Sequence, residues 1–523
     1  MVVPAAFAFL GGLAVSASSN YSILYDDNGS RRVRTCLRQY QTGKAHGILK
    51  RREKRDAREG VVSRVGSITG AGSSFAPAWT VRRLTVSPLR TRGLGSDAEP
   101  RLQLGLSATL AINEEVGRRR ASGEQILHLG FGEAGLPVHP ILREALSRAA
   151  GDGRYGPVRG DAGLRAAVAA AYVRRGLPTA PNQILVGPGS KPLLFALMLA
   201  MDGDVVLPRP SWVTYAAQAH LLERRVLRVP TPHDVGGIPD PAGLETEVAA
   251  ARARRLSPRI LLITNPDNPT GTTPSRETLA AVLRVACDQG LTVICDEIYS
   301  DLVHDPGQFV SAAVIDPNCV LTGGLSKSHA LGGWRVGILR LPATAEGERL
   351  GRRVEAIASE IWSALPSPMA SAAITAYEAP ELVAHVAASS RLHSQVAAAL
   401  HEAVVSSGAE CRAPTAAFYM YPDLERRRGL LAQKGITDGD TLARALLLEY
   451  GVAVLPGGAF GDDPAALRFR IASGLLYGAD DAERWEALRA ADTGSATSLP
   501  RIRRAVSYLR EALMALMAAP SVA

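Results

Sequence analysis

The sequence predicts an α/β protein in which helices flank a mostly parallel sheet, with a smaller α/β unit toward the C-terminus. Three observations predict this class. Short apolar runs alternate with helical stretches, polar loops follow those runs, and a long Ala-rich helical stretch separates the two parts. A chain of 523 residues is too long for one simple core, so two or more domains are expected.

The apolar runs of the larger part are short and apolar throughout, which is typical of strands covered on both faces. Such strands are expected at 183–186, 204–207, 259–264, 291–295 and 318–321. Helices are expected between them, for example at 162–175, 193–201 and 276–289. Pro192 suits the first turn of its helix because proline lacks only an N–H that would be unpaired there.

The smaller unit is predicted beyond a long helix at 380–405. Its strands are expected at 418–421, 452–455 and 467–471, and its helices at 441–449 and 499–518. We therefore expect a large domain over 146–385 and a small domain formed by 102–145 together with 386–520.

Residues 1–101 are expected to be a disordered basic extension. Residues 1–100 hold 16 Lys and Arg against 7 Asp and Glu; subtracting these from the 59 basic and 50 acidic residues of the chain leaves 43 of each. The remainder is neutral, so no nucleic-acid partner is expected. An apolar run at 5–15 resembles a secretory signal core, but no basic residue precedes it. No run approaches the ~20 apolar residues of a membrane helix, so no membrane partner is expected.

The five cysteines are odd in number, scattered, and without a Cys-x-x-Cys pair. This pattern argues for reduced thiols and against a zinc site. We therefore expect a cytoplasmic protein without a bound metal.

The stretch 322–335, Thr-Gly-Gly-Leu-Ser-Lys-Ser-His-Ala-Leu-Gly-Gly-Trp-Arg, centres on Lys327. After residue 100 the chain has only three lysines, although Arg is abundant, which indicates that this position needs a primary amine. An amine can form a Schiff base with an aldehyde, and a guanidinium cannot. Arg335 offers a fork of donors suited to a phosphate. An amine beside a phosphate clamp fits pyridoxal 5′-phosphate (PLP); a surface lysine in a glycine-rich turn is the alternative.

Polar side chains follow the predicted parallel strands. Because ligands of open α/β sheets bind beyond the carboxyl ends of the strands, these side chains are expected to meet at one rim. They are Trp212, Asn268, Asp296, Tyr299 and Lys327. The glycine loop 187–191 precedes a helix start and is a ready anion site. Taken alone, Asp296 could be a helix cap and Trp212 a core residue.

With these motifs in this order, the chain from about Leu102 to its C-terminus resembles the PLP-dependent aminotransferases of fold type I, class I/II, the aspartate aminotransferase-like family. The resemblance implies a mostly parallel seven-stranded sheet flanked by helices, and PLP as the cofactor. It also implies a homodimer with shared active sites. The reaction it implies moves an amino group between an L-amino acid and a 2-oxo acid in a ping-pong cycle.

The resemblance implies a role for each candidate residue. The catalytic residues would be Lys327, matching the Schiff-base lysine; Asp296, matching the partner of the pyridine nitrogen; and Tyr299. Tyr299 and Asn268 match the groups that hydrogen-bond the ring's phenolic oxygen, and Trp212 matches the aromatic stacked on the ring. The phosphate clamp matches Gly189, Ser190, Lys191, Ser326 and Arg335. Tyr155 matches a tyrosine that reaches the phosphate of the neighbouring subunit.

Gly132 and Arg468 match the groups that hold the substrate α-carboxylate, and Arg470 leaves the arginine assignment open by two residues. Two positions depart from the family pattern: Ala416 stands at a frequent glycine, and Gly324 at a serine of some members. No motif assigns a second arginine for a substrate side chain, so no preference for aspartate follows.

Two other functions share part of this pattern. Another PLP reaction on the same fold, by a C–S lyase or an amino-acid decarboxylase, would use the same lysine, aspartate and phosphate clamp. Some transcription regulators fuse a DNA-binding winged helix to an aminotransferase-like domain. Residues 1–100 lack the three periodic helices that such a fusion needs.

Overall fold

A computed structural model describes residues 22–25, 31–34, 105–232 and 237–519. The chain divides into two compact units, Met1–Gly93 and Leu94–Ala523. In the first unit β1 (Ser22–Tyr25) and β2 (Arg31–Arg34) pair antiparallel, which the sequence did not predict. The rest of the expected disordered extension lies outside the described residues.

The second unit contains a seven-stranded sheet in the order β4-β10-β9-β8-β7-β5-β6. The strands are β4 (Ile184–Gly187), β5 (Asp204–Arg209), β6 (Val226–Pro230), β7 (Pro258–Thr264), β8 (Thr292–Asp296), β9 (Val320–Gly324) and β10 (Gly337–Arg340). β10 runs antiparallel to both of its neighbours, and the other pairings are parallel. The predicted mostly parallel sheet is confirmed; β6 and β10 are the two strands that were not predicted.

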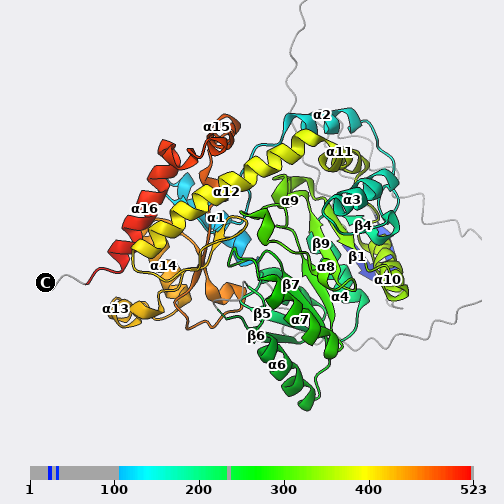
Figure 1. Cartoon of the computed structure of the whole chain (residues 1–523), viewed down its shortest axis with the longest axis horizontal. Helices are drawn as coiled ribbons and strands as arrows, with labels where there is room; N and C mark the ends of the chain where they lie inside the picture. The colour runs from blue at the N-terminus through cyan, green and yellow to red at the C-terminus, as the bar shows by residue number, and fades with distance from the viewer. Residues whose placement is uncertain (1–21, 26–30, 35–104, 233–236, 520–523) are drawn as a thin grey trace, which may run out of the picture. The chain divides into compact units, whose positions relative to one another are not determined.

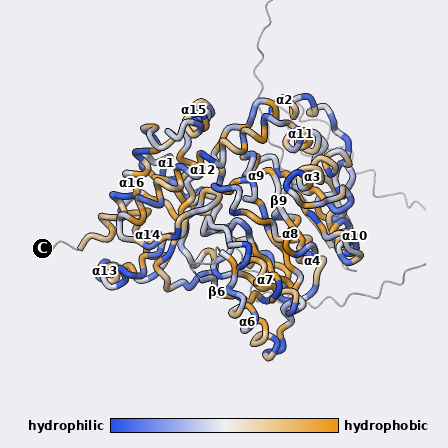
Figure 2. Tube along the Cα trace, viewed as in Figure 1, coloured by the Kyte–Doolittle hydropathy of each residue, from blue (hydrophilic) through white to orange (hydrophobic). Residues whose placement is uncertain are grey.

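Helices cover both faces of this sheet, which explains why its strands are apolar throughout (Figure 1). Ile260 and Leu262 share a hydrophobic cluster with α4 (Ser190–Ala200) and α10 (Ala345–Ile361). The alternate residues Leu261 and Ile263 share another with α6 (Pro241–Ala253) and α7 (Arg276–Asp288). In Figure 2 the hydrophobic colours gather along the strands between these helices.

A third cluster covers β4 and β10 with α3 (Ala162–Arg174) and α11 (Ser367–Glu378). The remaining helices of this unit outside the smaller part are α1 (Ala108–Ala121), α2 (Pro140–Ala149), α5 (Val213–Leu221), α8 (Ala312–Ile315) and α9 (Leu325–Ser328). None of the helices in the described ranges is long and apolar enough to cross a bilayer.

The smaller part packs around α12 (Pro380–Ser406), the long yellow helix of Figure 1. Its other helices are α13 (Arg428–Gln433), α14 (Gly439–Tyr450), α15 (Asp481–Asp492) and α16 (Pro500–Leu516). β11 (Tyr419–Met420), β14 (Phe469–Ala472) and β13 (Leu455–Pro456) form an antiparallel sheet, and β12 (Val452–Ala453) pairs in parallel with β3 (Leu127–His128). The domain bounds 146–385, and 102–145 with 386–520, stay a prediction.

The strand order brings the carboxyl ends of β7, β8 and β9 together. In the register, Thr264 is paired with Asp296, and Asp296 with Thr322. The loops that follow these strands therefore begin side by side at one edge of the sheet, where the site residues are expected.

Candidate active site

A cavity of about 570 Å³ opens at this edge of the sheet. Ten of the predicted site residues line it: Gly132, Ser190, Lys191, Trp212, Asn268, Asp296, Tyr299, Ser326, Lys327 and Arg335. The cavity thus brings together Gly132, residues that follow the strands of the large sheet, and residues of the segment after β9. The five residues that were expected to meet at one rim of the sheet all line this cavity.

Lys327 lies on α9, the short helix that begins directly after β9. Its Nζ donates a hydrogen bond to the Gly132 carbonyl at 2.6 Å. Burial, and next the positive charge of Arg470, lower the pKa of the Lys327 amine to about 8. Roughly a tenth of this amine is therefore neutral, and able to act as a base, at pH 7.

Asp296 ends β8 and is 2% exposed. Its Oδ2 accepts a hydrogen bond from the Tyr215 hydroxyl at 2.9 Å, while its Oδ1 has no partner among the described residues. Burial raises the pKa of this carboxyl to about 6. A buried carboxylate oxygen without a donor costs free energy, so Oδ1 marks the place where an N–H of a ligand would fit.

A chain of hydroxyls and amides lies beside this carboxylate. The Tyr299 hydroxyl accepts a hydrogen bond from Asn268 Nδ2 at 3.4 Å and lies 2.9 Å from the Tyr419 hydroxyl. Tyr215 and Tyr419 both line the cavity, and neither was predicted. Tyr215 follows Trp212 by three residues, one helical turn, which is a signal that could have identified it. Tyr419 ends the Ala-Ala-Phe-Tyr stretch in which Ala416 was noted.

The start of α4 and the loop after β9 form an anion cradle. Gly189 precedes α4 with φ +98°, and a Cβ there would lie 2.1 Å from Arg335 Nη2. Arg335 therefore lies directly against the helix N-terminus, where its Nη1 donates to Gly332 O at 2.9 Å and Ser326 Oγ at 3.4 Å. Lys191 Nζ lies 5.4 Å from the centre of the Trp212 ring.

Arg468 does not line this cavity, contrary to the prediction. Its Nε donates to Asp423 Oδ2 at 2.7 Å, and its Nη1 lies 3.3 Å from Asp462 Oδ2. It precedes β14, where it makes an isolated bridge with Asp423, and it faces a second cavity. Two nearby carboxylates therefore hold Arg468 away from the site.

Arg470, the alternative that was left open, lines the cavity. It is 1% exposed, and its Nη2 donates to Gly130 O at 2.7 Å while its Nη1 donates to Asn268 Oδ1 at 3.2 Å. Its Nε has no hydrogen-bond partner, and no ion pair involves it in the part of the chain that the structure describes. The charge of Arg470 is thus available to an anionic ligand.

Tyr155 is 94% exposed and lies outside the cavity. It lines a different surface pocket with Arg154 and Ser367. Tyr155 is therefore not among the residues that line the candidate site in the described part of the single chain.

The model of the family "Aminotransferase class I and II" matches residues 125–475. This range holds Lys327, Asp296, Asn268, Tyr299 and Arg470. The chain belongs to this family, and it is an aminotransferase.

Curated relatives and solved structures agree with this assignment. The aspartate aminotransferase of Streptomyces avermitilis is 30% identical over 387 residues, which cover 70% of this chain and 90% of the relative. The aspartate/prephenate aminotransferase of Cereibacter sphaeroides is 32% identical over 382 residues, or 70% and 91% of the two chains. The structure of Thermus thermophilus aspartate aminotransferase with maleate superposes with a TM-score of 0.64 at 28% identity, covering 78% of this chain and all of that one.

Proposed function

We propose that this aminotransferase binds PLP in the cavity beyond β7, β8 and β9 and moves an amino group between an L-amino acid and a 2-oxo acid in a ping-pong cycle. One observation carries the proposal: the amine of Lys327 and the partnerless oxygen of Asp296 line the same cavity. They are the two groups that a pyridine aldehyde requires.

The cavity fits this cofactor at both of its ends. Asp296 Oδ1 would accept a hydrogen bond from a protonated ring nitrogen, and Trp212, which lines the same cavity, would stack on the ring. Ser190, Ser326 and Arg335 surround the start of α4, where a phosphate is stabilised by N–H groups and by the helix dipole. When bound, PLP supplies an aldehyde and a ring that withdraws electrons from the substrate Cα.

We assign a separate role in the reaction to each of the main residues that line the cavity. Lys327 would hold the aldehyde, and its free amine would be the base that moves the proton at the substrate Cα. Asp296 would keep the ring nitrogen protonated, and Asn268 and Tyr299, which are hydrogen-bonded to each other, would donate to the ring oxygen. Arg470 binds the substrate α-carboxylate, as its free Nε and its buried charge favour.

The names of the relatives make L-aspartate the first amino donor to test. PLP-loaded enzyme mixed with L-aspartate should convert to the pyridoxamine form, seen as an absorbance change, and 2-oxoglutarate should reverse it. Leu110, Phe131 and Ile298 also line the cavity, so the donor panel includes L-phenylalanine and L-leucine. Release of pyruvate and ammonia without the pyridoxamine form would instead support a C–S lyase.

The two neighbouring arginines allow a matched test of carboxylate binding. Arg470→Lys should raise KM for the amino acid about 100-fold, because a buried bidentate pair is lost. Arg468→Lys keeps a charge beside its two acids and should leave KM near the wild-type value. Equal effects on KM would contradict the assignment of Arg470.

We also propose a homodimer, in which the exposed Tyr155 contributes to the phosphate site of the partner subunit. Tyr155 is 94% exposed on a loop of the large domain, where its side chain is free to reach another subunit, and this supports the proposal. Four cysteines of the described ranges, Cys287, Cys295, Cys319 and Cys411, are free thiols, which supports a reducing compartment such as the cytoplasm.

A further inference from the structure

Phe460 contacts Arg470 but has no part in the proposed chemistry. Phe460 is 1% exposed, and its ring centre lies 4.9 Å from the guanidinium carbon of Arg470. Tyr419 makes a similar contact at 4.8 Å. The face of an aromatic ring attracts a cation, and the attraction grows when water is excluded, as it is here.

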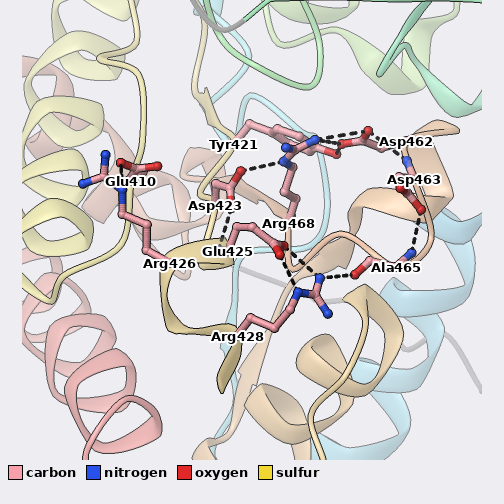
Figure 3. A network of polar contacts seen from close by, with 10 residues as sticks. All are labelled: Glu410, Tyr421, Asp423, Glu425, Arg426, Arg428, Asp462, Asp463, Ala465 and Arg468. Atoms are coloured by element: carbon pink, nitrogen blue, oxygen red, sulfur yellow. Dashed lines mark hydrogen bonds and ion pairs between the residues drawn. The ribbon is translucent and has the colours of Figure 1, made fainter. Parts of the chain in front are cut away.

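The loop that carries Phe460 is held by a charged network (Figure 3). Asp462 follows Phe460 by two residues, accepts a hydrogen bond from the Tyr421 hydroxyl at 2.9 Å and pairs with Arg468 at 3.3 Å. Arg468 also pairs with Asp423 at 2.7 Å. Both carboxylates are 6% exposed, so this network is screened little by solvent.

The backbone of the same loop is hydrogen-bonded to two other segments of the chain. Gly457 N donates to Arg468 O at 2.8 Å, which ties the start of the loop to the chain just before β14. Phe460 O accepts from Ser211 N at 3.0 Å, one residue before the cavity-lining Trp212. The backbone at Phe460 is therefore held at two points, by Arg468 and by Ser211.

Arg468 and Arg470 show two different ways to hold a buried guanidinium. Arg468 has carboxylate partners, which occupy its donors. Arg470 has rings, a carbonyl and an amide, which hold the group but leave its positive charge uncompensated within the described residues. A carboxylate beside Arg470 would compete with a carboxylate ligand, whereas an aromatic ring does not.

We propose that Phe460 is a positioning residue that holds Arg470 where the substrate carboxylate binds without neutralising it, and that the ion pair between Asp462 and Arg468 fixes Phe460 in that place. This proposal rests on the proposed function, in which Arg470 binds the α-carboxylate. It assigns Arg468, two residues away, an indirect part in the same binding step.

The test compares carboxylate affinity in PLP-loaded, full-length variants. The probes are succinate and 3-phenylpropanoate, which lack an amino group, and KM for the best amino donor. Phe460→Leu removes the ring and should raise both inhibition constants and KM about tenfold, with kcat and PLP affinity close to wild type. Phe460→Tyr keeps the ring and should restore most of the affinity. Asp462→Asn should raise the same constants roughly threefold, since the amide keeps a hydrogen bond and loses the ion pair.

Phe469→Leu is the matched control. Phe469 is as fully buried as Phe460 and begins β14, but it belongs to the hydrophobic cluster of the smaller part and makes no ring contact with Arg470. It should leave carboxylate affinity unchanged, even if it lowers the melting temperature. If Phe460→Leu does not bind PLP, Phe460→Met, which fills the space without a ring, takes its place.

Two results would overturn the proposal. One is wild-type carboxylate affinity in the ring-less Phe460 variants, and the other is an equal loss of affinity in Phe469→Leu. Arg470→Lys separates this failure from a failure of the proposed function. If Arg470→Lys also binds the probes normally, Arg470 is not the carboxylate ligand; if it binds them weakly while Phe460→Leu does not, only the role of Phe460 is wrong.

Discussion

Lys327 and Asp296 are both buried ionisable groups, and burial shifts their pKa values in opposite directions. The pKa of Lys327 falls to about 8 and that of Asp296 rises to about 6, because a buried site disfavours the charged form of each. The cavity thus contains an amine that deprotonates easily and a carboxyl that needs a cationic partner to stay ionised. Both properties suit a site that receives a protonated ring nitrogen and uses an amine as a base.

Replacement of Lys327 by Arg tests the need for a primary amine. The variant keeps a positive charge, but its guanidinium neither bonds to an aldehyde nor accepts a proton at neutral pH. We expect the transamination rate to fall at least about 10³-fold. Rates with the best donor pair measure the loss, and borohydride reduction followed by peptide mapping measures attachment of the cofactor.

Lys434→Arg is the control for this substitution. Lys434 donates to the carbonyls of Ala515 and Leu516 at the end of α16, far from the cavity in sequence and not among its lining residues. Its activity should equal that of the wild type. A Lys327→Arg enzyme with more than a small residual rate would contradict the role of this amine.

The lowered pKa of Lys327 predicts the pH dependence of its reactivity. The charged amine is disfavoured by burial first and by Arg470 second, so the neutral, nucleophilic form should be lost as the pH falls below about 8. In cofactor-free protein, acetic anhydride should label Lys327 with a midpoint near pH 8, measured by mass spectrometry. Arg470→Gln removes one cause and should move the midpoint to higher pH. A midpoint near the ordinary value of lysine in the wild type would refute the shift.

At the scale of elements, the junction of β4 with α4 creates the anion cradle. The chain turns at Gly189 with φ +98°, a conformation that favours glycine, and Arg335 fills the space where a side chain would stand. Gly324 is similar, because a Cβ there would lie 2.4 Å from Val336 O. This contact gives a physical reason for glycine at position 324.

Gly189→Ala should therefore weaken PLP binding. Its Cβ would displace Arg335 from the helix N-terminus and remove a charge-assisted contact with the phosphate, for an expected loss of about 10- to 100-fold in affinity. Titration of cofactor-free protein with PLP, followed by absorbance, measures this loss.

Gly176→Ala separates backbone strain from the steric effect. Gly176 has φ +77° but open space around its Cβ position. This variant should lose about 1 kcal/mol of stability in thermal unfolding, with PLP affinity unchanged. If both variants bound PLP equally well, the contact between Gly189 and Arg335 would have no part in the phosphate site.

At the scale of the whole molecule, all residues proposed for the site belong to the second unit, and one of them, Tyr155, is proposed to act in the site of the partner subunit. The exposed Tyr155 is the residue that makes the dimer a testable proposal. A chain of 55.2 kDa should elute with about twice that mass in light-scattering chromatography.

Hybrid dimers test whether the sites are shared. Lys327→Ala and Tyr155→Ala should each be nearly inactive alone. When the two are co-expressed, half of the dimers are hybrids, and each hybrid has one intact site if Tyr155 serves its partner, so activity should recover to about a quarter of the wild type. No recovery would mean that Tyr155 acts within its own subunit, and full activity of Tyr155→Ala alone would mean that it has no part in the site.

Much of the large sheet and of the site could be predicted from local sequence. Buried parallel strands are apolar on both faces, so five of the seven were visible as short apolar runs. The polar residues that follow them, such as Asn268 and Asp296, were visible for the same reason. β6 was missed because the half-buried Arg228 and the exposed Pro230 interrupt the run, and β10 because it is a short strand between two loops.

The sequence by itself determined the fold class, and it predicted Lys327 and Asp296 as site residues, because both follow recognisable strands within motifs that resemble the family. Only the tertiary structure decided between Arg468 and Arg470, and revealed Tyr215, Tyr419 and Phe460 around them. The physical reason is that the partners of an arginine are set by segments distant in the chain. Asp423 and Asp462 neutralise one guanidinium, while aromatic rings and Asn268 leave the other charged and facing the cavity.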